Sequence, residues 1–392
     1  DCAEYKGNEF KDTTVCKLLN TALKNANSDV HFCQGVNYPE FVSNVPDIVE
    51  GVYQISNEKE LYAFANLVNN YAEPNANAVL TADIVVNTGV LKADGNLADD
   101  VSTFTSWTPI GNSSNKYTGT FDGQGHTISG LYFNDTNANY VGLFGCLGTD
   151  GEIKNVGVID SYFRGYSYVG GVCGENNSGT ITGCYNTGTV SSSYNYAGGV
   201  CGVNRNTITG CYNTGSVNGR SRVGGVSGWN GTNNTTNTSG TMTGCYNIGA
   251  VSSSNGFVGG VCGYNYTTIT GCYTNKGNVC GYNSGGTVTN CEKYTGNEFT
   301  NATVCGLLNA ALKNYGSSVR FYQGVKSPVF IHASQLVDGV YQISCAAELY
   351  WFADKVNNDN ANYGSAKAVL TADIVVNTGV LKADGTLNSG TF

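Results

Sequence analysis

Tyr196-Ala-Gly-Gly-Val-Cys-Gly-Val-Asn-Arg-Asn-Thr-Ile-Thr-Gly-Cys-Tyr-Asn-Thr-Gly215 is the stretch that decides the fold. With the residues that follow, it contains three short runs of β type, at 197–203, 207–213 and 216–218. Asn204-Arg-Asn206 and Thr214-Gly215 separate these runs, and both Asn and Gly tolerate the positive φ angles of tight corners. The stretch is therefore predicted to be one rung made of strands and corners.

The second run shows how such a rung could be buried. If it is one continuous strand, its side chains alternate between two faces. One face then carries Ile208, Gly210 and Tyr212, and the other carries Thr207, Thr209, Cys211 and Asn213. A single rung cannot bury its apolar face alone, whereas rungs stacked about 4.8 Å apart pair their backbones and cover one another.

Two phrases from this rung recur between residues 140 and 291. The first returns as Tyr140-Val-Gly-Leu-Phe-Gly145, Tyr168-Val-Gly-Gly-Val-Cys-Gly174, Val223-Gly-Gly-Val-Ser-Gly228 and Val258-Gly-Gly-Val-Cys-Gly263; the second as Gly183-Cys-Tyr-Asn-Thr-Gly188, Gly244-Cys-Tyr-Asn-Ile-Gly249 and Gly271-Cys-Tyr-Thr274. Copies lie 28 (168 − 140), 28 (196 − 168) and 27 (210 − 183) residues apart. This fixed period favours an all-β fold of parallel β-helix modules with short capping helices. An antiparallel sandwich of short hairpins is the alternative, but its turns need not repeat at a fixed interval.

The composition argues against two classes of partner. The 392 residues contain 20 Lys and Arg against 29 Asp and Glu, a formal charge of −9, so there is no basic stripe to neutralise the phosphates of a nucleic acid. No apolar run approaches the roughly 20 residues that span a membrane. The chain opens on Asp1 without a secretory signal, and we expect it to be a mature or excised piece.

A second, longer repeat encloses the rungs. Cys2–Phe10 resembles Cys291–Phe299 at an offset of 289 (291 − 2), and Ala78–Gly95 returns as Ala368–Gly385 at an offset of 290 (368 − 78). We therefore predict modules in tandem: 1–45 as the tail of one (a helix plus a joint), 46–333 as a complete one, and 334–392 as the start of the next. Within the complete module we predict a cap helix at 56–69, a β-solenoid at 78–291, and a helix and joint at 292–333.

The cap helix is predicted from its apolar face. Ser56 is a candidate N-cap, and Leu61, Phe64, Ala65 and Val68 follow at helical spacing. The helix is expected to cover the open end of the solenoid, where strand edges would otherwise be unpaired.

Other elements follow along the complete module. Ala78–Val86 is predicted as a buried first strand and Thr118–Ile128 as strand, tight turn and strand. Thr300 or Asn301 is expected to cap the second helix, and Pro328-Val-Phe330 to end the joint.

The repeated phrases resemble a known family. Gly142-Leu-Phe-Gly145 and the Gly-Gly-Val-Cys-Gly forms are similar to the GLUG motif of bacterial surface proteins, and the stretches at 107–111, 117–128 and 130–133 resemble its lead-in. The resemblance covers most of residues 46–290. It implies secreted or wall-attached proteins used as adhesins or stalks, and such repeats also occur in the non-catalytic part of IgA-cleaving metallopeptidases. This chain departs from the usual pattern by its many cysteines.

Fifteen cysteines without Cys-x-x-Cys, and with no His near a Cys pair, favour disulfides in an extracellular, oxidising compartment over a zinc site. Eight fall into pairs separated by 11, 10, 10 and 11 residues: Cys173/Cys184, Cys201/Cys211, Cys262/Cys272 and Cys280/Cys291. In the remaining rung, extra residues around 230–240 stretch the spacing and Ser227 stands in place of the first cysteine. Bridges within a rung are therefore preferred, each contributing about 2–3 kcal/mol.

Bridges between rungs are the alternative, because equivalent residues of stacked strands lie about 4.8 Å apart, within Cα range of a disulfide. No partner is assigned to Cys16, Cys33, Cys146, Cys245, Cys305 and Cys345.

The residue types argue against an enzyme. Glu175 is the only acidic residue between 161 and 291, so no carboxylate pair for polysaccharide cleavage can form there. Asp94-Gly and Asp122-Gly are typical of turns, and His126 has no partner nearby in the sequence. No His-Glu-x-x-His occurs. We expect no catalytic residue, cofactor or metal.

Binding is harder to exclude. The recurring Tyr185, Tyr212, Tyr246 and Tyr273 could pack within the solenoid or, if exposed, bind flat sugar rings; Trp229, where the inserted segment starts, could also face a ligand. Packing is the favoured outcome. We predict an extracellular stalk, adhesin or fibre subunit whose partners are identical modules or subunits end to end and, in the adhesive case, glycans or host surface proteins. A non-catalytic scaffold or carbohydrate-binding region of a larger secreted enzyme is the alternative.

Overall fold

The computed structural model describes residues 15, 18–22, 31–34, 39–42, 44–71, 73–231, 240–324, 326–330, 335–337, 340–343, 349, 352–353, 356–357 and 364–370. The chain divides into two compact units. The first consists of Asp1–Thr295 with Ala311–Ser317, and the second of Gly296–Ala310 with Ser318–Phe392.

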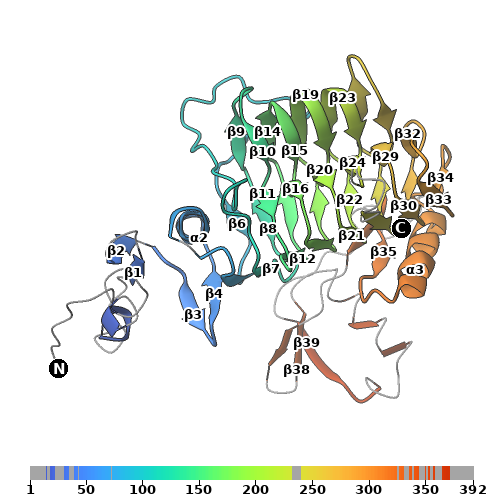
Figure 1. The fold of residues 1–392 in the computed structure, drawn as a ribbon. Coiled ribbons are helices and arrows are strands. Elements are labelled where there is room, and N and C mark those ends of the chain that lie inside the picture. The colour runs from blue at the N-terminus through green and yellow to red at the C-terminus, as the bar shows by residue number, and fades with distance from the viewer. Residues whose placement is uncertain are drawn as a thin grey trace, which may run out of the picture. The chain divides into compact units, whose positions relative to one another are not determined.

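The first unit contains a β-solenoid with four walls (Figure 1). Wall 1 has six strands: β11 (Phe144–Leu147), β16 (Cys173–Asn176), β20 (Cys201–Asn204), β24 (Ser227–Asn230), β29 (Cys262–Asn265) and β32 (Cys280–Asn283). Wall 2 has ten: β3 (Asp47–Val49), β4 (Val52–Ile55), β5 (Asn77–Leu80), β7 (Thr120–Asp122), β12 (Glu152–Lys154), β17 (Thr180–Thr182), β21 (Thr207–Thr209), β25 (Thr241–Thr243), β30 (Thr268–Thr270) and β33 (Thr287–Thr289).

The other two walls have eight strands each. Wall 3 consists of β6 (Ile84–Val85), β8 (Thr127–Ser129), β13 (Gly157–Ile159), β18 (Tyr185–Asn186), β22 (Tyr212–Asn213), β26 (Tyr246–Asn247), β31 (Tyr273–Thr274) and β34 (Glu292–Lys293). Wall 4 consists of β9 (Tyr132–Asn134), β10 (Asn139–Val141), β14 (Tyr162–Gly165), β15 (Ser167–Gly170), β19 (Thr189–Gly198), β23 (Val217–Gly224), β27 (Val251–Ser253) and β28 (Val258–Gly259).

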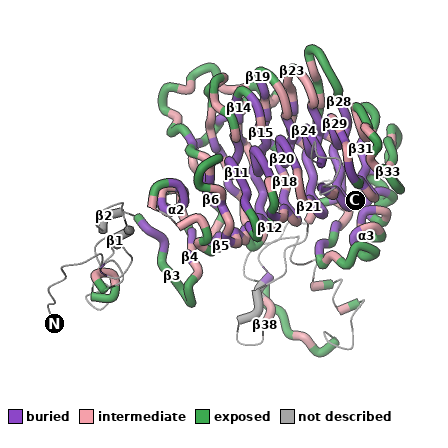
Figure 2. The backbone as a smooth tube through the Cα atoms, in the orientation of Figure 1, coloured by how far each residue is buried: buried purple, intermediate pink, exposed green. Residues whose placement is uncertain are grey.

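Successive rungs pair in parallel and in register. On wall 2, Ile153 pairs with Ile181, Ile181 with Ile208, and Ile208 with Met242. All four side chains are fully buried and belong to one hydrophobic core, and buried residues predominate along the strands of the walls (Figure 2). The parallel β-helix prediction is therefore confirmed, and the antiparallel sandwich is wrong.

The predicted run at 207–213 is not one strand. β21 ends at Thr209 and β22 begins at Tyr212, because Gly210 has a left-handed φ of 61° and forms a corner. The corner resets the alternation, so Ile208 and Cys211 both lie in the hydrophobic core. The prediction that they lie on opposite faces was wrong, since period-two alternation holds only within an unbroken strand.

A glycine on wall 1 allows neighbouring backbones to approach closely. A Cβ on Gly202 would lie 2.6 Å from the carbonyl oxygen of Gly174 and from the nitrogen of Val169. No side chain fits there, which explains why the glycine after Cys201 returns in the repeated phrase.

The helix α2 (Glu58–Asn70) caps the first rung. Its N-cap is Asn57, whose side chain accepts hydrogen bonds from the backbone N–H groups of Lys59 and Glu60. Ser56, the predicted N-cap, instead donates its hydroxyl to the Glu60 carboxylate at 2.9 Å. The prediction was wrong by one residue because both side chains are good caps.

The apolar face of α2 is as predicted. Leu61, Phe64, Ala65 and Val68 are buried, and the Phe64 ring lies 6.1 Å from that of Phe121 on β7. The helix therefore covers the end of the solenoid, as expected (Figure 1).

The first rung differs from the prediction in one respect. Ala78–Val86 forms two strands, β5 on wall 2 and β6 on wall 3, rather than one. Within 118–128 a strand, a turn and a second strand occur as predicted: β7 and β8 flank a turn in which Gln124 and Gly125 have positive φ.

The helix α3 (Thr303–Tyr315) follows the solenoid, and the Thr303 N–H donates to the Asn301 side chain at 3.1 Å, one of the two predicted caps. In the first unit, Ala311 and Leu312 of this helix lie against wall 3. A Cβ on Gly271 would lie 2.2 Å from the Ala311 Cβ, and one on Gly244 would lie 2.6 Å from the Leu312 side chain.

Short sheets occur outside the solenoid. Two are antiparallel pairs, β1 (His31–Gln34) with β2 (Pro39–Val42), and β35 (Phe321–Gln323) with β36 (Pro328–Phe330). A third joins β37 (Gln335–Val337), β38 (Val340–Ile343) and β39 (Lys367–Leu370). It repeats the order of β3, β4 and β5, an antiparallel pair followed by a parallel strand. The boundaries of the tandem modules stay a prediction.

Candidate functional site

Columns of buried asparagines hold successive rungs together. At the ends of β16, β20, β24, β29 and β32 on wall 1, one side-chain amide donates to the next at 2.8–2.9 Å, from the buried Asn176, Asn204, Asn230 and Asn265 to the exposed Asn283. A second column on wall 3 joins Asn186, Asn213 and Asn247 at 2.8 Å. Asn recurs at a constant place in the repeated phrases, but from the sequence it was predicted only to allow tight corners.

The recurring tyrosines form a stacked column on wall 3. The rings of Tyr185 and Tyr212 lie 4.8 Å apart at 3°, and those of Tyr212 and Tyr246 lie 4.9 Å apart at 7°. Tyr212, Tyr246 and Tyr273 are 6%, 0% and 4% exposed. These three rings are buried in the fold, which is the packing that the sequence favoured over the possible ligand-facing role.

Tyr185 lies at the edge of this tyrosine column. It is half-buried, and burial raises the pKa of its hydroxyl to about 12. A ligand-facing role for Tyr185 stays a prediction. Trp229 is 5% exposed and stacks on Tyr264 at 4.8 Å, so the ligand-facing prediction is wrong for this residue. The inserted segment at 232–239 lies outside the described residues.

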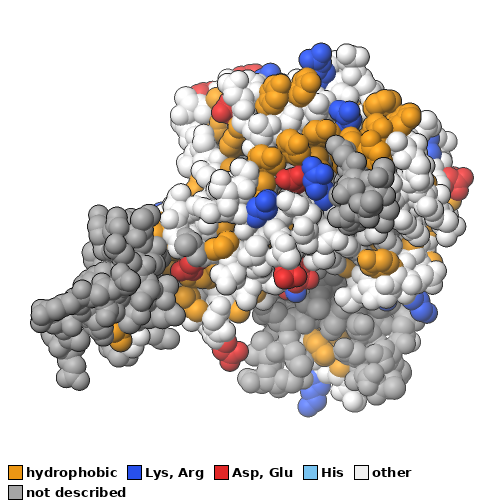
Figure 3. Space-filling model, viewed as in Figure 1, with side chains coloured by type: hydrophobic (Ala, Val, Ile, Leu, Met, Phe, Trp, Pro, Cys, Tyr) orange, Lys and Arg blue, Asp and Glu red, His pale blue; other side chains and the backbone are white. Residues whose placement is uncertain are grey.

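A different set of aromatic side chains is accessible to solvent. We define the aromatic–arginine strip by its members on walls 4 and 1, namely Tyr140, Tyr168, Tyr196, Arg222, Tyr264 and Tyr282. All are half-buried except Tyr282, which is 45% exposed. Hydrophobic side chains gather in a band on the face of the molecule seen in Figure 3, with few charges among them.

Arginine joins the two halves of the strip. Tyr140 stacks on Tyr168 at 4.7 Å, and Tyr168 lies 5.1 Å from Tyr196. The Arg222 guanidinium then lies 5.3 Å from the ring centre of Tyr196 and 5.6 Å from that of Tyr264. It also lies 5.4 Å from the buried Trp229, so one cation contacts three rings.

The backbone directs these side chains outward. Tyr140, Tyr168, Tyr196 and Arg222 have φ angles of 63°, 58°, 62° and 54°, a left-handed conformation that is uncommon for such residues. Each precedes the Val-Gly or Ala-Gly step of the first repeated phrase. The sequence placed Tyr there but gave no sign that this position has positive φ, so the strip was missed.

One buried ion pair lies beside the strip. Glu175 is 7% exposed, and its carboxylate accepts a hydrogen bond from Arg205 Nε at 2.8 Å. Cys146 pairs in register with Glu175, and burial, followed by the charge of Glu175, raises the pKa of this thiol to about 12. A thiol held protonated in this way is a poor nucleophile.

Four aspartates, among them the Asp94 and Asp122 predicted at turns, form hydrogen bonds within turns. Asp94, Asp100, Asp122 and Asp135 each accept a backbone N–H from two residues further on, at 2.9 Å. This confirms the turn interpretation for Asp94 and Asp122. His126 does have a partner that the sequence did not reveal, the carboxylate of Asp83 at 3.3 Å.

Among the described residues, no group of three or more His, Cys, Asp or Glu side chains could hold a metal ion. None of the helices in that part of the chain is long and apolar enough to cross a membrane.

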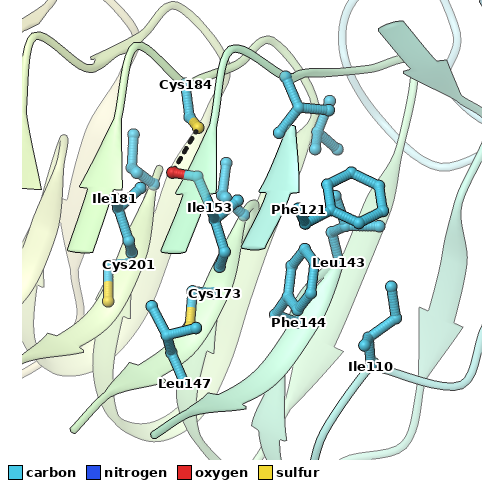
Figure 4. Packing of buried hydrophobic residues seen from close by; sticks show 14 of the residues in the cluster. Ile110, Phe121, Leu143, Phe144, Leu147, Ile153, Cys173, Ile181, Cys184 and Cys201 are labelled. Carbon is cyan, nitrogen blue, oxygen red and sulfur yellow. Dashed lines mark hydrogen bonds between the residues drawn. The ribbon is translucent and has the colours of Figure 1, made fainter. Parts of the chain in front are cut away.

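The predicted disulfide cysteines are free thiols arranged in two columns. Eleven of the 15 cysteines in the chain, those from Cys146 to Cys305, are free. Cys173 and Cys201 lie on adjacent strands of wall 1, whereas Cys184 lies beyond Ile153 and Ile181, where its thiol contacts the Ile153 carbonyl (Figure 4). The structure therefore does not hold the predicted within-rung bridges of Cys173, Cys201, Cys262 and Cys280 with Cys184, Cys211, Cys272 and Cys291.

One turn of the solenoid matches a known sequence motif. A model of the GLUG motif matches residues 165–191, which run from the end of β14 into β19 and include Tyr168, Cys173 and Tyr185. The chain carries the GLUG motif. The later rungs repeat the same phrases in register, so the GLUG motif corresponds here to one turn of a parallel β-solenoid.

Relatives match over limited lengths. A protein described as a candidate Gly-rich membrane protein of Evansella cellulosilytica is 36% identical over 77 residues, 19% of this chain. Halomucin of Haloquadratum walsbyi is 33% identical over 152 residues, 38% of this chain. The chain spans 9% and 2% of the length of these relatives.

A solved structure shares the fold. It is a Bacteroides ovatus protein described as a candidate immunoglobulin A1 protease, with a TM-score of 0.50 and 20% identity. The match covers 72% of this chain and 92% of that one. At this identity the similarity concerns the fold alone.

Proposed function

We propose that this chain is a structural segment of a larger extracellular or cell-surface protein, in which stacked GLUG rungs form a stiff stalk. The observation that carries the proposal is the unbroken register along wall 1. Each rung from 144 to 283 pairs with the next through wall 1. The asparagine column of wall 1 ties the rungs from Asn176 to Asn283 together through side chains.

Such an arrangement resists extension because separating two rungs breaks several strand pairs at once and leaves buried amides unpaired. The relatives support the surface assignment by their descriptions, a membrane protein and a halomucin. They are also far longer than this chain, as a segment within a large protein would require.

Pulling on single molecules through tags at the two termini tests the stalk. We expect the solenoid to unfold in steps, each releasing one rung of 28 residues (196 − 168) and about 100 Å of chain. An Asn213→Ala variant should weaken one step, whereas Asn134→Ala, at an exposed position, should not. Collapse of the whole solenoid in one low-force event would contradict the proposal.

Location is tested separately. Antibodies against residues 46–293 should label intact cells of the source organism, and external protease should remove the label. Labelling only after the cells are opened would contradict a surface position.

We infer a second, adhesive function from the aromatic–arginine strip. Its ring faces largely cover one another, so the side turned to solvent offers ring edges, hydroxyls and a guanidinium, which suit the hydroxyls of glycans. Binding to a glycan array tests the adhesive function. Arg222→Ala should abolish binding, whereas the control Lys276→Ala, which removes an exposed charge elsewhere, should keep it. If the unaltered chain binds no glycan, the adhesive function is wrong and only the stalk proposal stands. A scaffold or carbohydrate-binding region of a larger secreted enzyme predicts the same strip but a catalytic domain elsewhere in the protein.

A further inference from the structure

The thiols of wall 1 form a column with one interruption. We define column 1 as Cys173, Cys201, Ser227, Cys262 and Cys280, which pair in register in that order. Cys173, Cys201 and Cys262 are fully buried, and Cys280 is half-buried.

Ser227 occupies the place of a cysteine. Its hydroxyl donates to the carbonyl two residues on, at 2.8 Å, and the thiols of Cys201 and Cys262 do the same at 3.1 and 3.3 Å. The three side chains therefore point in the same direction on successive rungs. The serine divides column 1 into two pairs of adjacent cysteines, each with a single possible partner.

The geometry points to disulfides between rungs, and we propose that Cys173–Cys201 and Cys262–Cys280 are cross-linked when the protein meets a disulfide oxidant. In-register residues on adjacent parallel strands have Cα atoms about 4.8 Å apart, inside the range that a disulfide spans. The rival partner of Cys173 in its own rung, Cys184, lies on the far side of Ile153 and Ile181 (Figure 4).

The chemistry is thiol–disulfide exchange with a small-molecule disulfide such as glutathione disulfide. One protein thiolate attacks the oxidant, forming a mixed disulfide and releasing one glutathione thiol. The second protein thiolate attacks the protein sulfur of that bond and releases the other thiol. One protein S–S bond forms, the oxidant S–S bond breaks, and the two released thiolates take up the two protons.

The thiols of wall 3 provide an internal comparison. Column 2 is uninterrupted and consists of Cys184, Cys211, Cys245, Cys272 and Cys291, in which each backbone N–H donates to the sulfur of the next rung at 3.3–3.4 Å. Five thiols cannot all pair, and each inner one has two neighbours. Column 2 should therefore give mixed pairings with one thiol left over, whereas column 1 should give one pattern.

Access sets the order of oxidation. Cys280 is half-buried on the last wall 1 strand, and its partner Cys262 lies directly beneath it. Cys262–Cys280 should therefore form first in the folded protein. Cys173–Cys201 requires local opening or oxidation during folding.

Peptide mapping tests the proposal. The 392-residue chain is refolded in a glutathione redox buffer, its free thiols are alkylated under denaturing conditions, and the unreduced digest is analysed by mass spectrometry. Cys173–Cys201 and Cys262–Cys280 should account for most links from column 1. Cys146, buried with Glu175 as its register partner, should be alkylated. Links between Cys173 and Cys184, or four alkylated column 1 thiols, would overturn the proposal.

Two variants that should remain folded provide a further test of which cysteines pair. Cys201→Ser mimics the serine already tolerated at 227 and should leave Cys173 alkylated while Cys262–Cys280 persists. Ser227→Cys completes the column and should produce new links from position 227 to Cys201 and Cys262. An unchanged link pattern in both variants, each shown to be folded by circular dichroism, would refute column pairing. The test is made in solution, so it does not depend on where the protein functions.

Discussion

The tyrosine column of wall 3 and the aromatic–arginine strip are both aromatic ladders with a ring on successive rungs, yet only one is accessible. In the first, Tyr212 and Tyr246 stack at 7° and are almost completely buried. In the second, Tyr168 and Tyr196 are tilted by 45° and half-buried, and Arg222 takes the place of a ring. Repetition of an aromatic residue therefore does not decide its role.

The difference arises from the backbone. Tyr212 and Tyr246 lie on regular strands whose neighbours hold the rings parallel. Tyr168 and Tyr196 lie in the left-handed region, which turns each ring away from the strand plane. The first column is therefore a part of the packed structure, and the second is a surface.

Truncation of the buried ladder should have the largest effect. Tyr246→Ala removes a fully buried ring and should lower the free energy of unfolding by about 3–5 kcal/mol. The matched change Tyr168→Ala, in the half-buried strip, should cost only about 1 kcal/mol. Denaturant unfolding measures both, and equal losses would remove the distinction between the two ladders.

A methyl group beneath the strip should have the next largest effect. Gly202→Ala would place a Cβ 2.6 Å from backbone atoms of the preceding rung and should destabilise the protein by about 1–3 kcal/mol. Gly306→Ala is the control, since it lies in α3 with no atom within 4 Å, and it should be neutral or stabilising. Thermal unfolding of both variants decides whether the close backbone approach at wall 1 requires glycine at position 202.

Removal of the Arg222 guanidinium should have a smaller effect on stability. Arg222→Ala loses its contacts with three rings and should cost about 1 kcal/mol in stability. Arg220→Ala, which loses one contact with Tyr194, should cost less. If both variants unfold at the same denaturant concentration as the unaltered protein, the guanidinium does not hold the strip together.

Alkaline titration should give the smallest difference between the two ladders, but it observes their tyrosine hydroxyls directly. Burial raises the pKa of Tyr185 to about 12, whereas a hydrogen bond from Tyr266 lowers the pKa of Tyr264. Tyrosinate absorbance from Tyr264 should therefore appear at lower pH than that from Tyr185. Because the folded pKa of Tyr185 exceeds its unfolded value near 10, its contribution to stability is complete below pH about 10 and is lost between about 10 and 12.

Substitution identifies the two signals. Tyr185→Phe should remove a late-titrating component, and Tyr264→Phe an early one. If the Tyr185 variant instead lost early absorbance, the buried ladder would be open to solvent.

Local rules predicted much of the architecture. The Gly-Gly-Val-Cys-Gly and Gly-Cys-Tyr-Asn phrases indicated stacked rungs, and the helical spacing from Leu61 to Val68 indicated the capping helix. Asp94-Gly and Asp122-Gly indicated turns, which the Asp side chains form with their own backbone. These features depend on neighbours in the sequence, so they could be read without coordinates.

Other features could not be read in this way. The corner at Gly210 broke the expected alternation, which moved Cys211 into the core and changed its partner from its own rung to the next. The asparagine columns and the strip arise only when positions 18 to 35 residues apart are stacked, since each side chain then meets its equivalent. No spacing within one rung encodes that contact.

The amino-acid sequence by itself determined the repeat, the parallel β-solenoid and its helical cap, because these follow from periodic apolar residues and corner-forming glycines. The tertiary structure decided which repeated side chains are covered and which face solvent. That outcome depends on the handedness of single backbone positions such as Tyr196 and on what packs against each wall, and both are settled only when the rungs are stacked.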